Sequence, residues 1–216
     1  VTPLWLDEIP AMILLEDVIS KYQFGNRSKY ILEAVIGEYD DPFNQSQNIL
    51  TLPLSEKGHT IVFGNAVSGK EIFLSTVIFD LCNNYSPEYL NMYILDFGNE
   101  TLQMFAKAPQ VGDVILSSDE EKVYRLIKLL KETLLEHKKI LSEAGGTYEL
   151  YYKLNDKPLK NVVVIINNFA ALNELYEDVV EELAYLTREG TKYGIYFIFS
   201  VSTSNEIKYK ILQNCS

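Results

Sequence analysis

Hydrophobic residues occur along this chain in short continuous runs that alternate with longer periodic stretches. Continuous apolar runs are typical of strands in the covered centre of a parallel sheet. Such runs occupy residues 162–166 and 195–199. We also expect strands at residues 59–63, at residues 92–95, where the strand ends at Asp96, and at residues 111–116.

Three stretches between these strands predict helices. Residues 71–82 are apolar almost all round, so we expect a buried helix there. Residues 119–144 carry apolar side chains on one stripe, with Asp119 as the expected N-cap and Gly145-Gly146 as the stop signal. Residues 172–187 form the third expected helix. The alternation predicts βαβ units with right-handed crossovers.

The first part of the chain has a different pattern. Residues 5–10 contain a proline and read as an extended lead-in, and residues 31–36 predict a strand that turn-forming residues end at 40–42. Residues 49–54 predict another strand, antiparallel at an edge of the sheet. We therefore divide the chain into a lead-in with edge strands over residues 1–58 and a core over residues 59–216.

A glycine-rich loop separates the first core strand from the first core helix. Its spacing is G-x-x-x-x-G-K, in which backbone N–H groups wrap a phosphate and the lysine reaches the outer phosphates. The loop consists of Gly64, Asn65, Ala66, Val67, Ser68, Gly69 and Lys70. With this loop in place, the elements predict a RecA-like P-loop NTPase fold of the α/β class, with a mainly parallel central sheet flanked by helices and extra N-terminal edge strands.

The residue after the lysine departs from the P-loop pattern. Glu71 stands where a serine or threonine hydroxyl binds Mg²⁺. A carboxylate about 4 Å from a phosphate charge is repelled by about 4 kcal/mol at a near-surface effective dielectric constant. Glu71 could instead occupy the helix N-terminus, or pair with Lys70, as a built-in substitute for phosphate. In either arrangement we expect poor Mg·ATP affinity.

The second half of an ATPase site is altered as well. P-loop motors carry an Asp at a strand end that helps to hold Mg²⁺, often followed by an acid that activates water. Here the matching strand ends in Asn167 and Asn168, which supply neither a base nor negative charge. Asp96, at the end of another strand, is open to two interpretations: a contact near the nucleotide, or a turn-forming residue.

The net charge of the chain reduces the number of candidate functions further. The chain has 216 residues and a net charge of −11, with arginines only at positions 27, 125 and 188. Duplex DNA binding relies on Lys and Arg at the phosphates, so this composition disfavours nucleic acid as a partner. No apolar run approaches the roughly 18 residues that span a bilayer. Without an initial Met, the chain is expected to be a piece of a longer protein.

With these residues located, the chain resembles the FtsK/SpoIIIE-type ATPases, and within them the type VII secretion coupling ATPases called EssC and EccC. The resemblance runs nearly end to end. It rests on residues 5–10, 37–47 (G-x-x-D-D-P followed by Q-x-Q), 58–59, 86–88, 96–98, 188–190 and 193–195.

The resemblance implies a cytoplasmic domain of a bacterial cell-membrane protein that carries several ATPase domains in tandem. It also implies hexamer formation and docking of secreted WXG100-type substrates. The C-terminal ATPase domains of such proteins are often degenerate, which matches Glu71, Asn167 and Asn168.

Three functions remain open at this stage. The leading hypothesis is a degenerate ATPase module of type VII secretion, with weak ATP binding, no Mg²⁺ and little or no hydrolysis, which acts in substrate recognition, assembly or regulation of the motor. The second is an active ATPase that powers secretion and uses unusual residues. The third, a DNA translocase, is disfavoured by charge.

Overall fold

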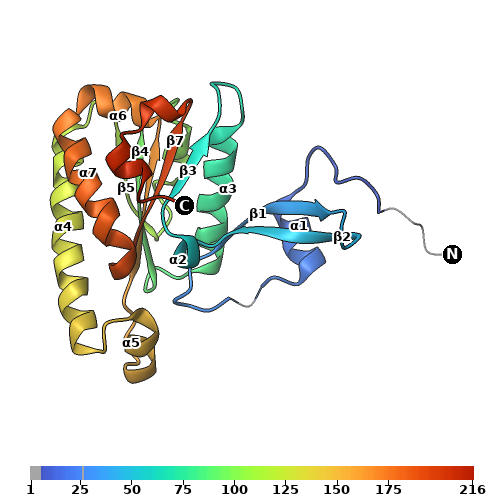
Figure 1. Cartoon of the computed structure of the whole chain (residues 1–216), viewed down its shortest axis with the longest axis horizontal. Coiled ribbons are helices and arrows are strands. Elements are labelled where there is room, and N and C mark those ends of the chain that lie inside the picture. The colour runs from blue at the N-terminus through green and yellow to red at the C-terminus, as the bar shows by residue number, and fades with distance from the viewer. Residues whose placement is uncertain (1–5, 26) are drawn as a thin grey trace.

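The core of the protein is a five-stranded parallel sheet. A computed structural model describes residues 6–25 and 27–216; Trp5 of the expected lead-in lies outside these residues, and residues 6–10 form no helix or strand. The strand order is β3-β7-β6-β4-β5, so the first core strand lies at one edge (Figure 1). All five predicted core strands are confirmed, as β3 (Thr60–Phe63), β4 (Leu90–Asp96), β5 (Val111–Leu116), β6 (Asn161–Asn167) and β7 (Ile195–Val201).

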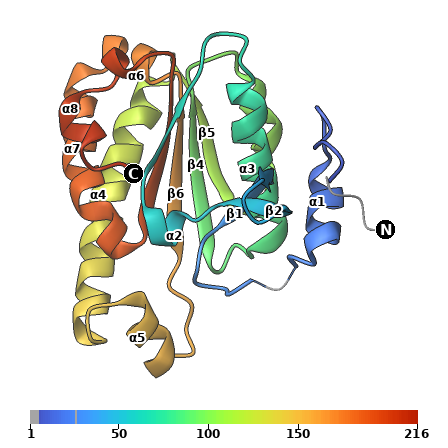
Figure 2. The ribbon, with the colours of Figure 1, turned by 45° about the vertical axis from the view of Figure 1, so that its right-hand side comes forward.

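Helices cover both faces of the sheet, which explains the continuous apolar runs. Along β6, Val162, Val164 and Ile166 belong to one hydrophobic cluster, whereas Val163 and Ile165 belong to the cluster on the opposite face. Figure 2 shows α4 (Glu120–Glu143) and α7 (Glu177–Gly190) on one face and α3 (Lys70–Asn84) on the other. Successive strand residues point to opposite faces, so a strand covered on both sides must be apolar throughout.

The helices differ from their predictions in two places. The helix expected over residues 172–187 is two helices, α6 (Phe169–Leu175) and α7, because Tyr176 has a φ of −138° and interrupts the helical backbone. The helix expected over residues 71–82 is not buried all round: Ile72 is 73% exposed and Phe79 is 45% exposed, whereas Leu74 is fully buried. One side of α3 faces the sheet and β1 also contacts this helix, whereas Ile72 and Phe79 lie on a side that stays exposed.

The long helix α4 matches its prediction. Asp119 precedes its first residue, but the Asp119 carboxylate accepts from the Leu116 N–H at 3.1 Å and caps no helical N–H group. Gly145 and Gly146 both have a φ of +88°, which side chains disfavour, and the Gly146 N–H donates to the Leu141 carbonyl at 2.7 Å. His137 on its apolar stripe is buried. α5 (Tyr148–Leu154) follows and leads to β6.

The N-terminal strands do not join the central sheet. β1 (Ala34–Asp41) and β2 (Ser46–Leu52) pair with each other as an antiparallel two-stranded sheet. The two predicted strands are therefore confirmed, but their expected place at an edge of the central sheet is wrong. Pairing continues through the expected break and ends only at Asp41, whose side chain accepts from the Asn44 N–H at 3.1 Å. An unpredicted helix, α1 (Leu15–Tyr22), packs on this hairpin through the Lys21–Glu38 ion pair at 2.6 Å.

A buried ion pair fastens the N-terminal part to the helix that follows the glycine-rich loop. Arg27 donates to both carboxylate oxygens of Asp80 on α3, at 2.5 and 2.9 Å, and the Val35 N–H donates to the same carboxylate at 2.9 Å. The Asp80 side chain is fully buried. Removing one partner of such a pair would leave an uncompensated charge in the core, so this contact holds residues 27–35 against α3.

Short elements complete the chain: α2 (Leu54–Lys57), η1 (Thr101–Phe105), η2 (Thr191–Tyr193), η3 (Ser204–Glu206) and α8 (Tyr209–Leu212). Over residues 6–25 and 27–216, none of the helices has both the length and the apolar composition that crossing a bilayer requires.

Candidate functional site

The glycine-rich loop has the backbone geometry of a phosphate loop. It connects the end of β3 to the start of α3, and the Gly64 N–H donates to the Val201 carbonyl of β7 at 3.1 Å. A Cβ at position 64 would collide with the Ser68 side chain, and Gly69 has a φ of +85°. Both positions therefore require glycine, which explains the spacing of the motif.

Lys70 begins α3 and turns toward the carboxyl end of β7. Its Nζ lies 3.4 Å from the Val201 carbonyl oxygen and 3.3 Å from the Ser202 hydroxyl. Both distances are long for hydrogen bonds, so these contacts hold the amine weakly. The amine remains at the edge of the sheet where ligands bind in open α/β folds.

Glu71 follows in the first turn of α3, where a carboxylate is favoured by the helix dipole. Among the described residues its carboxylate has no hydrogen-bond or ion-pair partner, so the Lys70–Glu71 pair considered from the sequence is not formed. The side chain is half-buried. An unpaired carboxylate therefore stands at the position that holds the metal ligand in P-loop enzymes.

Asn167 is part of a buried chain of hydrogen bonds across three strands. The Ser200 hydroxyl of β7 donates to Asn167 Oδ1 at 2.8 Å, and Asn167 Nδ2 donates to Asp96 Oδ1 at 2.9 Å. All three side chains are buried, with exposed fractions of 0% for Ser200 and Asp96 and 1% for Asn167. The Asn167 side chain is thus committed to the fold.

Asn168 points elsewhere. It has a left-handed backbone with a φ of 63°, its N–H donates to the Ser200 hydroxyl at 2.9 Å, and its Nδ2 donates to the Phe97 carbonyl at 3.0 Å. Asn tolerates this backbone conformation better than most residues. The two asparagines therefore join the ends of β4, β6 and β7, and Asn168 reaches a backbone atom of the loop after β4.

Asp96 takes the structural role of its two interpretations. Its Oδ2 accepts from the Leu102 N–H at 2.9 Å and its Oδ1 accepts from the Gly98 N–H at 3.3 Å. Both oxygens are occupied by the loop that follows β4 and by Asn167. The carboxylate holds that loop in place through these three contacts.

The loop from Gly64 to Gly69 and the start of α3 fit a phosphate group, because both glycine requirements are met and the helix N-terminus follows. The metal-binding half differs from the P-loop pattern, because Glu71 replaces the hydroxyl and Asn167 directs its amide at Asp96. The sequence identified these residues, but their hydrogen bonding became visible only in the fold.

A groove that the sequence did not reveal lies beside the phosphate loop. It has a volume of about 700 Å³, and Glu71 is its one charged lining residue among those described. Val67 is 100% exposed and Met104 is 73% exposed at this surface. The groove is lined by Leu15, Ala66, Val67, Gly69, Glu71, Ile72, Ser75, Thr76, Phe79, Asn99, Thr101, Met104 and Phe105. Contiguous exposed apolar surface of this kind marks interaction sites.

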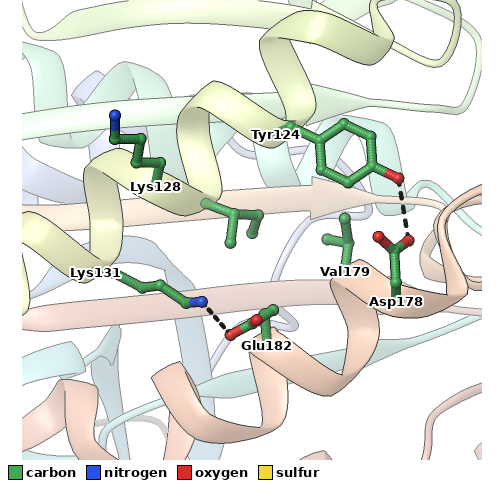
Figure 3. A pocket seen from close by; sticks show the side chains of 7 residues that line it. Tyr124, Lys128, Lys131, Asp178, Val179 and Glu182 are labelled. Atoms are coloured by element: carbon green, nitrogen blue, oxygen red, sulfur yellow. Dashed lines mark hydrogen bonds and ion pairs between the residues drawn. The ribbon is translucent and has the colours of Figure 1, made fainter.

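A smaller hollow of about 280 Å³ lies between α4 and α7 (Figure 3). Its polar groups are paired: the Tyr124 hydroxyl donates to Asp178 at 3.1 Å, and Lys131 lies 2.5 Å from Glu182. Another acidic residue of α7 is paired with a lysine as well, because Lys210 lies 3.0 Å from Glu181. Exposed pairs of this type contribute little to stability.

Comparisons with known proteins agree with this geometry. An EssC protein of type VII secretion from Staphylococcus aureus (strain MRSA252) is 31% identical over 97% of this chain, which spans 14% of that protein's length. The structure of EssC ATPases 2 and 3 from Geobacillus thermodenitrificans has a TM-score of 0.80 at 29% identity, over 87% of this chain and 36% of that one.

A second solved structure holds a peptide. Thermomonospora curvata EccC, ATPases 2 and 3 in complex with a signal sequence peptide, has a TM-score of 0.80 at 28% identity, over 88% of this chain and 36% of that one. The family model for the FtsK/SpoIIIE family matches residues 26–150, which is more than half of this chain. The fold and the phosphate loop of this chain agree with that match. The chain therefore belongs to the FtsK/SpoIIIE family.

Proposed function

We propose that this chain is an ATPase-type module of a type VII secretion coupling protein that hydrolyses ATP weakly or not at all. The observation that carries the proposal is the commitment of Asn167 to Ser200 and Asp96 in the core, at the strand end where P-loop motors hold Mg²⁺. Glu71 supports it, because it replaces the other metal ligand. The module acts in substrate recognition, assembly or regulation of the secretion motor.

Nucleotide binding follows from the same residues. The phosphate loop retains its backbone N–H groups, so ATP binds weakly through the phosphates without Mg²⁺. The Glu71 carboxylate opposes that binding by like-charge repulsion. Because the loop backbone is intact and its side chains are altered, we expect ATP binding that is weak and independent of the metal.

Protein partners account for the rest of the proposed role. The groove beside the phosphate loop offers exposed apolar surface, which supports contact with another protein. Its partners are neighbouring ATPase domains of the same polypeptide and secreted WXG100-type substrates, within a possible hexamer of the full protein. The chain is then a cytoplasmic domain of a bacterial cell-membrane protein. The solved relatives contain two ATPase domains, and one of them is in complex with a signal sequence peptide, which supports these partners.

Calorimetric titration with ATP, with and without Mg²⁺, tests this proposal. Wild type is expected to bind weakly and equally in both conditions, and Glu71→Thr to bind more tightly with Mg²⁺ present. Glu71→Gln is the matched control, because it removes the charge without adding a hydroxyl; it should improve binding without any Mg²⁺ dependence. Tight Mg²⁺-dependent binding by wild type would contradict the proposal.

The alternative of an active ATPase draws on one observation, the preserved phosphate loop with Lys70 at the start of α3. It requires steady Mg²⁺-dependent turnover that Lys70→Ala abolishes. A phosphate-release assay on wild type and Lys70→Ala separates the two functions, because the degenerate module gives little or no turnover above the Lys70→Ala background.

A further inference from the structure

Helix α5 presents a basic and apolar surface at one end of the molecule. Leu150 and Leu154 are 41% and 70% exposed, and because they are four residues apart on a helix they lie on the same side of it. Lys153 precedes Leu154, and Lys157 and Lys160 follow in the segment that leads to β6; all three lysines are exposed. Exposed leucines beside lysines form a contact surface for an apolar partner of negative charge.

The opposite side of α5 is packed against the core, so this surface is held in a fixed position. The Tyr152 hydroxyl donates to the Leu159 carbonyl at 2.8 Å and accepts from the Leu159 N–H at 2.9 Å. The Tyr152 ring stacks on the Tyr30 ring with the centroids 4.7 Å apart, and Tyr151 is buried. Tyrosines therefore anchor one side of the helix, while the leucines and lysines stay outside.

This end of the chain is basic although the whole chain is acidic. Residues 138–160 carry five lysines and three acidic residues, a net charge of +2, whereas the net charge of the whole chain is −11. Among the described residues only one of these five lysines forms an ion pair, Lys153 with Glu149 at 2.7 Å. The other four charges are available to an acidic partner.

The groove beside the phosphate loop has the complementary chemistry. Its lining includes the Glu71 carboxylate, which has no partner among the described residues. Two exposed acids, Glu16 and Asp17, directly follow a lining residue of α1, and Glu100 lies between two lining residues of the loop after β4. Apart from the lysine of the phosphate loop, Lys107 is the one base in the described chain within two residues of a lining position.

The groove also has the length that α5 requires. Its lining residues on α3 run from Glu71 to Phe79, which is about 12 Å along a helix. The seven residues of α5 span about 10 Å. Ile72 and Met104, each 73% exposed, give the groove apolar walls for the two leucines. An amphipathic helix in an apolar groove is a recurring mode of recognition between proteins.

α5 and the groove lie at opposite ends of one copy of the chain. α5 precedes β6 and protrudes beyond the lower end of the sheet in Figures 1 and 2, whereas the groove adjoins the loops that follow β3 and β4. A copy therefore cannot fill its groove with its own α5. Two different surfaces that fit each other join copies head to tail.

We propose that the groove beside the phosphate loop binds α5 of a second copy of this chain. Leu150 and Leu154 lie against the apolar walls, and the lysines of α5 and of the segment after it lie against the acidic residues. This inference rests on the proposed use of the groove for protein contact and names its occupant. The contact is heterologous, so each pair of copies retains one free groove and one free α5 and can add further copies.

Sedimentation equilibrium of the whole chain without nucleotide, from about 10 μM to 1 mM, tests this contact. Wild type should associate beyond a dimer. Ile72→Asp changes the groove and Leu154→Asp changes α5, and each alone should weaken the association at least tenfold. Both side chains are at least 70% exposed, so both variants should fold. An equimolar mixture of the two should form a 1:1 dimer and stop there, because one variant supplies an intact α5 and the other an intact groove.

Leu135→Asp on α4 is the matched control, because it makes the same substitution at a 62% exposed helical position outside both surfaces. It adds the same negative charge as the other two variants and should associate as wild type does. Glu71→Lys tests the charge complementarity. It lowers the net negative charge of the chain and with it the general repulsion between copies, yet it should weaken the association, because it removes the carboxylate that faces the lysines.

Four outcomes would overturn the inference. Wild type could remain monomeric at the highest concentration. Leu154→Asp could associate as well as Leu135→Asp, which would mean that groove pairs with groove. The mixture of Ile72→Asp and Leu154→Asp could stay monomeric although wild type associates, or Glu71→Lys could associate more strongly than wild type.

The failure of this inference is distinguishable from the failure of the proposed function. ATP turnover by wild type would overturn the proposed function and leave an association measured without nucleotide untouched. A monomeric wild type would overturn the second copy as occupant of the groove and leave weak ATP hydrolysis untouched.

Discussion

The phosphate loop and the end of β6 are the two halves of one ATPase site, and they have diverged in opposite ways. The loop keeps its backbone shape while its side chains face solvent, with Val67 100% exposed. At the end of β6 the side chains are buried, and Asn167 and Ser200 hold strands together. A site made of backbone N–H groups survives changes of side chain, whereas a site made of side chains can be absorbed into the fold.

Among the tests of this comparison, Ser200→Ala is expected to have the largest effect on the free energy of unfolding. The substitution removes the acceptor of the Asn168 N–H and the donor to Asn167 Oδ1, and the Asn167 oxygen then stays buried without this partner. We expect the free energy of unfolding to fall by about 2–3 kcal/mol, measured by urea denaturation. Ser202→Ala, two residues later and exposed, is the control and should cost under about 0.5 kcal/mol. Equal costs for the two would contradict the contrast.

A pH dependence of stability, intermediate in size, is expected from His59, which directly precedes the strand that leads into the phosphate loop. His59 is buried; its Nε2 donates to the Thr187 carbonyl at 2.7 Å and its Nδ1 accepts from the Phe197 N–H at 2.9 Å. Burial lowers the pKa of His59 to about 4. In the unfolded state the pKa of the His59 imidazole is near 6.5. As pH falls below this value, the unfolded state therefore binds a proton that the folded state does not bind.

Stability contributed by His59 should thus be fully present above about pH 6.5 and be lost as pH falls toward 4. Between pH 7 and 5.5 the expected loss is about 1–1.5 kcal/mol, measured by denaturation at each pH. NMR titration of the His59 ring is the direct check, and a protonated ring at pH 6 in the folded protein would refute the assignment. His137, whose pKa burial also lowers, adds a loss of the same sign.

The smallest effect is expected in the phosphate loop itself. Val67→Ser replaces a fully exposed side chain, so the free energy of unfolding should change by less than about 0.5 kcal/mol. Thermal denaturation checks this value. A loss above about 1 kcal/mol would mean that the loop side chains contribute to the fold, and the contrast between the two halves of the site would then fail.

The sequence predicted the elements whose signals are local. The central strands β6 and β7 were found because both of their faces are covered, so their apolar runs are continuous. The phosphate loop was found because the backbone requires glycine at Gly64 and Gly69. In both cases the residue type reports directly on its own backbone or burial.

Other features depend on distant partners and were missed or misplaced. The hairpin β1–β2 was expected at the sheet edge, but its position depends on contacts such as Arg27–Asp80 between residues far apart in sequence. The exposed side of α3 was expected to be buried, since an apolar residue such as Ile72 does not reveal whether another element covers it. The interruption at Tyr176 was hidden because the helical pattern continues on both sides of it.

Asn167 illustrates the difference between what the sequence determines and what the tertiary structure determines. The sequence alone determined that an amide replaces the acid at the end of β6, and that Glu71 replaces the hydroxyl after Lys70. Only the tertiary structure decided that this amide is occupied, because Ser200 and Asp96 lie 33 and 71 residues away along the chain. Hydrogen bonds between parallel strands join residues that have no sequence relation, so the use of a side chain at such a strand end is settled by folding.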